Sequence, residues 1–584
     1  MQISRKSSVL VLFASAAAIA GPAVARAAEY YVSPTGSDTS EGTLAAPFAT
    51  LAKAHSAAAA GDTIWVRGGT YTITTQLVLS KSGTSDSSRT KIWAYPGETP
   101  VLDASKYVTS NAAVDVPVVL VTGSWMHLRG LEISNAKVGA SGDHSYSLLR
   151  TKNASNNSFE LLKLHHGFGP GLFIDTGTGG NLILHCDSHD NYDKDGSQGD
   201  GQNGDGFGVH YQKTGPSTTI RGCRAWMDSD DGYDLISQEV PVTVEDSFAF
   251  GNGYGSDGNG NGFKMGSSQT GIRHIVQNNV AWKNKAAGFY ANHSSGGNTW
   301  YNNTAYNNGV QYNMLASSFD ADGNITGTIV LTGSKVHILR NNIGFPAKNS
   351  NMDGVDSGHN TWDLGLAETG ADFASSDPTG CDGPRQADGS MPAACTFMKL
   401  KAGSPLIDKG TDVGLPFVGA APDLGAYEYG ALPSTGGAGG SLSSAGGNAG
   451  TGGVASAGGG SGAIDAGAGG ILGTGGASRS DAGGGGNADG ITGAAGGTTT
   501  VAVGGSASSG GAVGAGGSIA AGGMSSSGAS SGAGGRSNAG GSSATGGGSS
   551  SGCGCALGGA ACTSPITMLL LAVLGLQLRR RGRH

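Results

Sequence analysis

Three short runs of similar composition decide the fold: GDGF at Gly204–Phe207, SDDGYD at Ser229–Asp234 and NGNGFK at Asn259–Lys264. A shorter run, AGF, follows at Ala287–Phe289. In each run a glycine precedes an aromatic residue, and successive aromatic residues are 26, 30 and 26 positions apart. Such intervals indicate a coiled repeat. We therefore predict that the four rings stack inside one solenoid, on rungs roughly 5 Å apart.

A second set of runs supports the same repeat. Their first residues, which we expect at one register, are Cys186, Cys223, Ser247, Asn279, Asn303 and Asn342. The intervals are 37, 24, 32, 24 and 39 positions. A coil of three short strands needs about 22–25 residues, so we assign the excess to loops. The three asparagines predict a ladder in which amides bond from rung to rung. The alternative is the ordinary preference of asparagine for turns.

The ends of the repeat can also be located. The alanine-rich segment Leu51–Ala60 predicts a capping helix, and the regular strands should begin at Ile64–Val66. We expect the solenoid to end near residues 404–429. Both ends resemble those of secreted right-handed parallel β-helix proteins. The predicted fold class is therefore all-β, a right-handed parallel β-helix.

Composition divides the 584 residues into segments of different character. Glycine, serine and alanine dominate beyond the predicted solenoid, and such a chain buries too little apolar surface to offset its ordering entropy. The expected segments are a signal peptide (1–27), a β-helix catalytic domain (28–430), a disordered linker (431–551) and a C-terminal sorting or transmembrane tail (552–584).

The two termini indicate export. The apolar run Val9–Ala20 follows two basic residues and precedes a small-x-small cleavage site at Ala25–Ala27. Near the other end, Gly552–Cys555 is followed by a small-apolar segment and by Arg579–Arg581. This arrangement resembles the Gly-Cys sorting tails of some Gram-negative bacteria; a simple membrane anchor is the alternative. We expect a secreted or surface-tethered protein that contacts the membrane only through this tail.

The net charge of −8 excludes some partners. Because the sequence has no basic stripe, we do not expect nucleic acid to bind. An acidic cleft repels a polyanion unless a cation bridges the two. We expect a monomer.

The cysteines fit an oxidising compartment. Cys381 and Cys395 bracket a loop and predict a disulfide. Cys186 and Cys223 occupy equivalent places in the repeat. We favour stacked thiols there over a bridge, because equivalent positions do not guarantee disulfide geometry.

The repeat gathers charged residues into one patch. Asp205 and Asp231 each stand two places before a stacked aromatic residue, and Asp234 and Lys264 each stand one place after one. Asp230 adds a fourth carboxylate. Several carboxylates this close need a counterion. Hard oxygen ligands in this number indicate calcium.

Other titratable residues carry weaker signals. The acidic loop with Asp193, Asp195 and Asp200 could hold a second calcium ion, but we favour a solvated loop. The histidines show no metal-ligand spacing and are expected in the core or on the surface: His165, His166, His189, His210, His274 and His293.

The same residues carry a resemblance to family 9 polysaccharide lyases, the pectate lyases with a lysine base. It rests on NGDGF at 203–207, GCRAW at 222–226 with SDDGYD at 229–234, and GNGFK at 260–264, and continues through NNVAW at 278–282 and NNTAYNN at 302–308. The resemblance implies that Asp205, Asp230, Asp231 and Asp234 bind Ca²⁺ and that Lys264 is the catalytic base. Tyr290–Asn292 departs from the family, where an acidic residue is expected.

The resemblance implies β-elimination on polygalacturonate. Lys264 would abstract the C5 proton, for which it must be neutral, so its pKa should be lowered by nearby cations or the enzyme should prefer alkaline pH. Alternatives are a lyase for another uronate polymer (rhamnogalacturonan or alginate), a glycoside hydrolase on the same fold, and a non-catalytic surface adhesin. Lys264 among the aspartates argues against the hydrolase, which needs paired carboxylates only.

Overall fold

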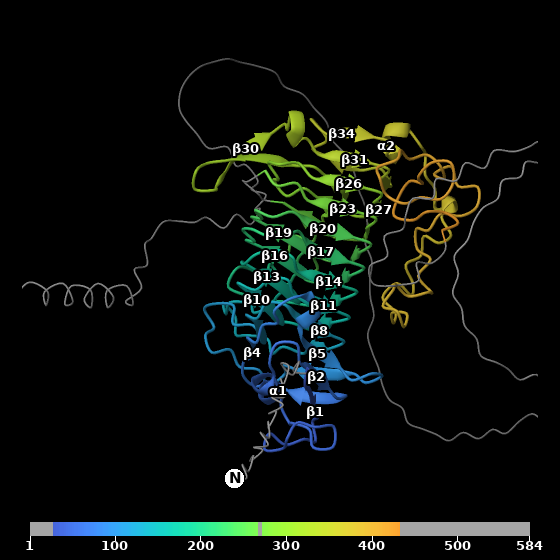
Figure 1. Ribbon diagram of the computed structural model, residues 1–584. Coiled ribbons are helices and arrows are strands. Elements are labelled where there is room, and N and C mark those ends of the chain that lie inside the picture. Colours follow the sequence, from blue (N-terminus) through green and yellow to red (C-terminus); the bar gives the residue numbers. More distant parts are fainter. Residues whose placement is uncertain (1–26, 267–270, 432–584) are drawn as a thin grey trace, which may run out of the picture. The chain divides into compact units, whose positions relative to one another are not determined.

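The computed structural model describes residues 27–266 and 271–431, and these residues form a parallel β-helix. Each full coil contributes one strand to each of three parallel sheets, so that coils stack from β1 (Glu29–Val32) at one end to β34 (Asp356–Gly358) at the other (Figure 1). The predicted solenoid is confirmed. The capping helix α1 is shorter than predicted and spans Leu51–Ala57.

The three sheets follow one another within each coil. Sheet 1 consists of β1, β2 (Thr63–Val66), β5 (Thr90–Ala94), β8 (Met126–Arg129), β11 (Ser158–Glu160), β14 (Leu182–Leu184), β17 (Thr218–Arg221), β20 (Val242–Glu245), β23 (Ile275–Gln277), β26 (Thr299–Tyr301), β31 (Ile338–Arg340) and β34. Sheet 2 consists of β3 (Gly69–Thr72), β6 (Pro100–Asp103), β9 (Glu132–Ser134), β12 (Lys163–His165), β15 (Asp187–His189), β18 (Arg224–Trp226), β21 (Phe248–Phe250), β24 (Val280–Trp282), β27 (Thr304–Tyr306) and β32 (Ile343–Phe345). Sheet 3 consists of β4 (Leu77–Leu79), β7 (Val119–Val121), β10 (Leu149–Lys152), β13 (Leu172–Asp175), β16 (Phe207–His210), β19 (Tyr233–Ile236), β22 (Phe263–Met265), β25 (Ala287–Tyr290), β28 (Val310–Asn313) and β33 (Asn349–Ser350).

A few elements lie outside the coils. An antiparallel hairpin of β29 (Ala316–Phe319) and β30 (Ile325–Ile329) projects from the stack. The short helical elements are α2 (Thr361–Leu364) and the 3-10 turns Asp86–Ser88, Gly333–Lys335 and Gly370–Asp372.

The predicted aromatic stack fills the core behind sheet 3. Phe207 stacks on Tyr233 at 5.2 Å between ring centroids, and Tyr233 stacks on Phe263 at 4.6 Å. Phe289 follows at 5.0 Å. Tyr312 extends the stack by one rung. All five residues are fully buried, so the stack fixes the register of the strands that carry them.

The asparagine ladder is also confirmed at the corner between sheets 1 and 2. The Asn279 amide N–H donates to Asn303 Oδ1 at 3.1 Å, and the Asn303 N–H donates to Asn342 Oδ1 at 2.9 Å. Cys186 and Cys223 occupy the same register as buried free thiols, as predicted. The Cys186 N–H donates to Cys223 Sγ at 3.4 Å.

A second ladder, which the sequence analysis missed, follows sheet 2. It runs from Asn191 through Asp228, Asn252 and Asn284 to Asn308, each backbone N–H donating to the next side-chain oxygen. Asp228 is the irregular member. It is fully buried, and its Oδ2 has no hydrogen-bond partner. Burial raises the pKa of the Asp228 carboxyl well above its ordinary value.

Asp228→Asn is therefore expected to stabilise the protein. The Asn252 amide donates to Asn284 Oδ1 at 3.0 Å, and an amide at position 228 can make the equivalent bond to Asn252. Satisfying a buried polar atom contributes about 1–3 kcal/mol, measurable by denaturant unfolding. The reverse change, Asn252→Asp, should destabilise the protein by a similar amount. A lower stability of Asp228→Asn contradicts this interpretation of the ladder.

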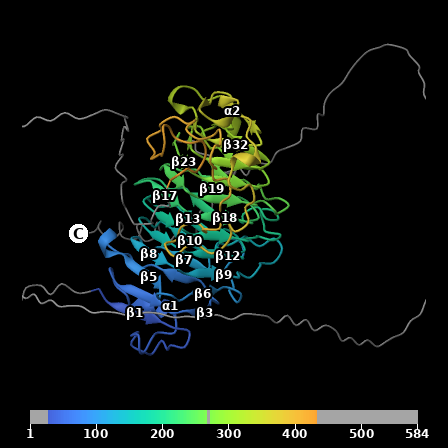
Figure 2. The ribbon, with the colours of Figure 1, turned by 90° about the vertical axis from the view of Figure 1, so that its right-hand side faces the viewer.

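The segment after the last coil covers sheet 2 and is not a further turn of the solenoid. Coil strands end at Gly358, whereas the sequence analysis expected the solenoid to continue to about residue 429. Phe397 packs on Trp282 at 4.8 Å between ring centroids. Figures 1 and 2 show this yellow-to-orange segment beside the strands of sheet 2. The predicted disulfide joins Cys381 to Cys395 within it.

The termini lie outside the described residues. The described residues include only residue 27 of the predicted signal peptide (1–27) and only residue 431 of the predicted linker (431–551). The predicted C-terminal tail (552–584), with its expected transmembrane run, lies wholly outside them. Among residues 27–266 and 271–431, no helix is long and apolar enough to cross a membrane.

Candidate active site and metal centre

Neighbouring strands of sheet 3 bring the predicted site residues together. Phe207 of β16 pairs with Tyr233 of β19, which pairs with Phe263 of β22. Because these rings point inward, the next residue of each strand points outward. Asp234 is therefore the lateral neighbour of Lys264, as the spacing of the sequence motifs predicted.

The glycines of the motifs allow the rungs to approach closely before each strand. A Cβ at Gly206 would lie 2.6 Å from the Gly232 carbonyl oxygen, and one at Gly232 would lie 2.8 Å from that of Gly262. Side chains at these positions would separate the rungs. The turns that carry Asp205 and Asp231 can therefore stack directly, and the Asp231 N–H donates to Asp205 Oδ1 at 3.1 Å.

Three of the four predicted carboxylates form one compact group. Asp205, Asp231 and Asp234 each offer an oxygen, and these oxygens lie within 4.8 Å of one another. All three residues are buried. Among the residues that the structure describes, only this group brings three or more acidic, histidine or cysteine side chains close enough to share a metal ion.

Asp230 lies outside this group. It is buried, but its Oδ1 accepts a hydrogen bond from the Asn259 N–H at 2.5 Å. Its neighbour Asp231 instead accepts from the Asn261 N–H at 2.6 Å and faces Lys264. Asp231 Oδ2 therefore faces Lys264, whereas the carboxylate of Asp230 is held by Asn259.

Lys264 lies against the carboxylate group. Its Nζ is 2.9 Å from Asp231 Oδ2 and 3.4 Å from Asp234 Oδ2. Burial disfavours the ammonium, but the four aspartates outweigh this effect and raise the pKa of Lys264 well above its ordinary value. A catalytic base needs a lowered pKa, so the effect of the aspartates on Lys264 is the opposite of what catalysis requires. The nearby cations that would lower the pKa are not supplied by these side chains.

The aspartates differ in their pKa values. Burial, followed by repulsion from Asp230, raises the pKa of Asp205 well above its ordinary value. Burial also raises the pKa of Asp231, although Lys264 opposes it. For Asp234, the opposing effects of Lys264 and His210 outweigh burial and lower the pKa. The carboxylates therefore cannot all ionise easily unless more positive charge is present.

This group fits a calcium ion. Its donors are carboxylate oxygens, the type that calcium prefers. Asp234 Oδ1 is buried without a hydrogen-bond partner, so it offers a free lone pair. Because an unsatisfied buried carboxylate oxygen is costly, a bound cation would relieve both this defect and the mutual repulsion of the aspartates.

Two side chains beside the site were not among the predicted site residues. The sequence analysis expected His210 in the core or on the surface. In the structure its Nε2 lies 3.6 Å from Asp234 Oδ2. It stands three places after Phe207 on the same strand, so strand alternation could have placed it on the outward face. Tyr290 pairs with Lys264 on the next rung.

In the acidic loop with Asp193, Asp195 and Asp200, the carboxylates are largely paired with other groups of the protein. Asp200 accepts hydrogen bonds from Tyr192 and Lys194, and Lys194 also pairs with Asp195. Asp193 is fully buried rather than solvated, and burial raises its pKa to about 6. These contacts do not leave an evident second metal site.

Comparisons with known proteins match most of the β-helix. Residues 30–361 match the family model described as "Pel9A-like, right handed beta helix region". Pectate lyase L of Dickeya dadantii is 35% identical over 414 residues, which cover 68% of this chain and 90% of the relative. Pectate lyase PEL9 of Emericella nidulans is 30% identical over 402 residues, which cover 62% of this chain and 90% of that protein.

Two solved structures are similar over most of the chain. The crystal structure of pectate lyase Pel9A has a TM-score of 0.59 and 32% identity, covering 70% of this chain and 97% of its own. A rhamnogalacturonan lyase has a TM-score of 0.55 and 29% identity, covering 64% and 96%.

Proposed function

The chain belongs to the Pel9A-like right-handed β-helix family, and from this premise we propose that it is a calcium-dependent pectate lyase that acts outside the cytoplasm. That it is a pectate lyase-like enzyme of the polysaccharide lyase class follows from its relatives. The observation that supports the specific chemistry is the contact of Lys264 Nζ with Asp231, inside a buried carboxylate group.

The proposed reaction is β-elimination at a uronate residue. Neutral Lys264 accepts the C5 proton, the C4–O4 bond breaks with its electron pair on O4, and a C4–C5 double bond forms. The departing O4 then takes a proton from solvent. Asp205, Asp231 and Asp234 would hold calcium, which supplies positive charge against the negative charge that develops as the proton leaves. Asp231 and Asp234 also position Lys264 through their ion pairs with it.

We propose polygalacturonate as the substrate, because the relatives are named pectate lyases. The similarity to a rhamnogalacturonan lyase favours that polymer as the second candidate. The lyase names of these relatives favour elimination over the hydrolase and adhesin alternatives.

A substrate panel with product masses tests this proposal. Polygalacturonate, rhamnogalacturonan and alginate are each incubated with the protein and calcium. We expect products from polygalacturonate that carry a double bond and lack the added water of hydrolysis. Hydrated products identify a hydrolase instead, and unsaturated products from rhamnogalacturonan alone identify the second candidate.

We also propose that the signal peptide directs export and that the linker and tail tether the enzyme, at least transiently, at the cell surface. The basis is the sequence of residues 1–27, 431–551 and 552–584. An acidic extracellular polymer as substrate requires this location. Cell fractionation with an antibody to the β-helix tests it, and a cytoplasmic protein contradicts it.

A further inference from the structure

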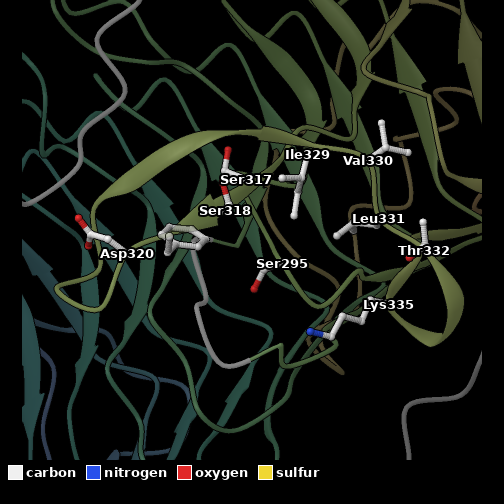
Figure 3. Close-up of a pocket in the computed structure, with 10 residues that line it drawn as sticks. Ser295, Ser317, Ser318, Asp320, Ile329, Val330, Leu331, Thr332 and Lys335 are labelled. Atoms are coloured by element: carbon white, nitrogen blue, oxygen red, sulfur yellow. The ribbon is translucent and has the colours of Figure 1, made fainter.

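A pocket of about 390 Å³ lies beside the hairpin β29–β30 and is separate from the carboxylate group. Its lining combines hydroxyl groups, one lysine and aliphatic side chains, and it includes Ser295, Ser317, Ile329, Val330 and Lys335. Figure 3 shows these side chains around the pocket. The volume is in the range of small-ligand sites.

A series of contacts leads from the active site, through the turn that follows β25, to the pocket beyond the end of sheet 3. Lys264 pairs with Tyr290 on the next rung. The Tyr290 ring lies 6.1 Å from that of His293, whose Nδ1 is 2.7 Å from Ser317 Oγ. Two rungs correspond to roughly 10 Å. A polymer with one unit at Lys264 that crosses this turn as it passes along the coils would reach the pocket with a unit further along.

The lining has the chemistry of a site for an acidic sugar. Lys335 is exposed, and among the described residues it has no carboxylate partner within ion-pair distance. Ile329 and Val330 are 36% and 58% exposed, and they offer an apolar surface to the face of a sugar ring. The exposed side chain of Thr332 adds a hydroxyl group beside them.

The one acidic residue of the lining, Asp320, is held by hydrogen bonds within the hairpin turn and does not pair with Lys335. Asp320 Oδ1 accepts from the N–H groups of Asp322 and Asn324, and Oδ2 accepts from the Asn324 amide. Its carboxylate is therefore used within the hairpin turn, and in Figure 3 it points away from Lys335.

The turn that carries Lys335 is held in place. The Arg273 guanidinium Nη2 donates to the carbonyl oxygens of Ser334 and Val336, each at 2.8 Å. Gly297 packs so closely beneath the turn that a Cβ there would lie 2.1 Å from the Lys335 carbonyl oxygen. Lys335 is thus anchored at its backbone, and only its side chain has to be ordered by a ligand.

We propose that this pocket is a subsite of the substrate polymer, in which Lys335 binds the carboxylate of a uronate unit beyond the one cleaved. The inference rests on the proposed function and adds a specificity-determining residue to it. Because Lys335 lies away from the reacting atoms, it should contribute to binding and not to the chemical step.

Steady-state kinetics on polygalacturonate test the subsite. Lys335→Gln is expected to raise KM about 3- to 10-fold with kcat unchanged, because an exposed charge-assisted contact is lost. Lys335→Arg should retain most of the affinity. Lys401→Gln, at an exposed lysine of the covering segment, should leave both constants unchanged.

The outcomes separate this inference from the proposed function. If the wild-type enzyme cleaves polygalacturonate and Lys335→Gln has the wild-type KM, the subsite is wrong and the proposed function stands. If Lys335→Gln lowers kcat and its melting temperature together, the residue has a structural role and the subsite is also wrong. A wild-type protein that leaves polygalacturonate intact overturns the proposed function and the subsite together.

Discussion

Lys264→Ala is expected to lose elimination activity by about 10²- to 10⁴-fold, the range typical of a removed general base. The variant keeps the aromatic stack, since Lys264 points outward from β22 while its neighbours Phe263 and Met265 are buried in the core. It loses the ion pairs with Asp231 and Asp234. Initial rates on polygalacturonate at saturating calcium, together with the melting temperature, measure both effects.

Lys264→Arg is the matched control for charge. Arginine retains a positive charge among the aspartates but cannot be deprotonated, so it cannot accept the C5 proton. We expect this variant to be as inactive as Lys264→Ala. An arginine variant with near wild-type activity would mean that position 264 supplies charge only, and the base would have to be sought elsewhere.

Asp231→Asn is expected to weaken calcium binding by at least about 10- to 100-fold, since it neutralises a central oxygen donor. The amide has nearly the same shape, and its oxygen can still accept from the Asn261 N–H. Calcium titration calorimetry measures the affinity. The melting temperature in calcium provides a second reading, because a ligand that binds only the folded state stabilises it by mass action.

The adjacent variant Asp230→Asn makes this test sharper. The family resemblance implies that Asp230 is also a ligand, whereas the structure places its carboxylate against Asn259 and outside the compact group. We expect Asp230→Asn to weaken calcium binding much less than Asp231→Asn. Equal losses for the two variants would contradict the three-carboxylate site and favour the set of four.

The sequence predicts those features that repeat in register. Spacing of Phe207, Tyr233 and Phe263 is enough to place Asp234 beside Lys264, because an inward ring fixes which neighbours point outward. The ladder asparagines and the two free thiols follow from the same alignment. In each case one residue per coil repeats a single environment.

Apart from the second ladder, which repeats in register from Asn191 to Asn308, the features that were missed do not repeat. The interval of 39 positions between Asn303 and Asn342 was assigned to an unspecified loop, but it contains the hairpin β29–β30 beside the pocket. The covering segment packs through contacts that do not repeat from coil to coil, such as those of Phe397 with Trp282 and Tyr306, and these leave no periodic signal. The orientation of Asp230 depends on one hydrogen bond to Asn259, and sequence spacing cannot distinguish it from Asp231.

The central claim is that Lys264 and the group of Asp205, Asp231 and Asp234 carry out a calcium-dependent elimination. The most direct measurement is the ultraviolet absorbance of unsaturated uronide formed from polygalacturonate by the wild-type protein, first in calcium, then in excess chelator, and then with calcium restored. The account predicts absorbance that rises with calcium, stops with chelator and resumes on re-addition, with no rise at any stage for Lys264→Arg. A steady rise in chelator, or cleavage without any rise in absorbance, would contradict it.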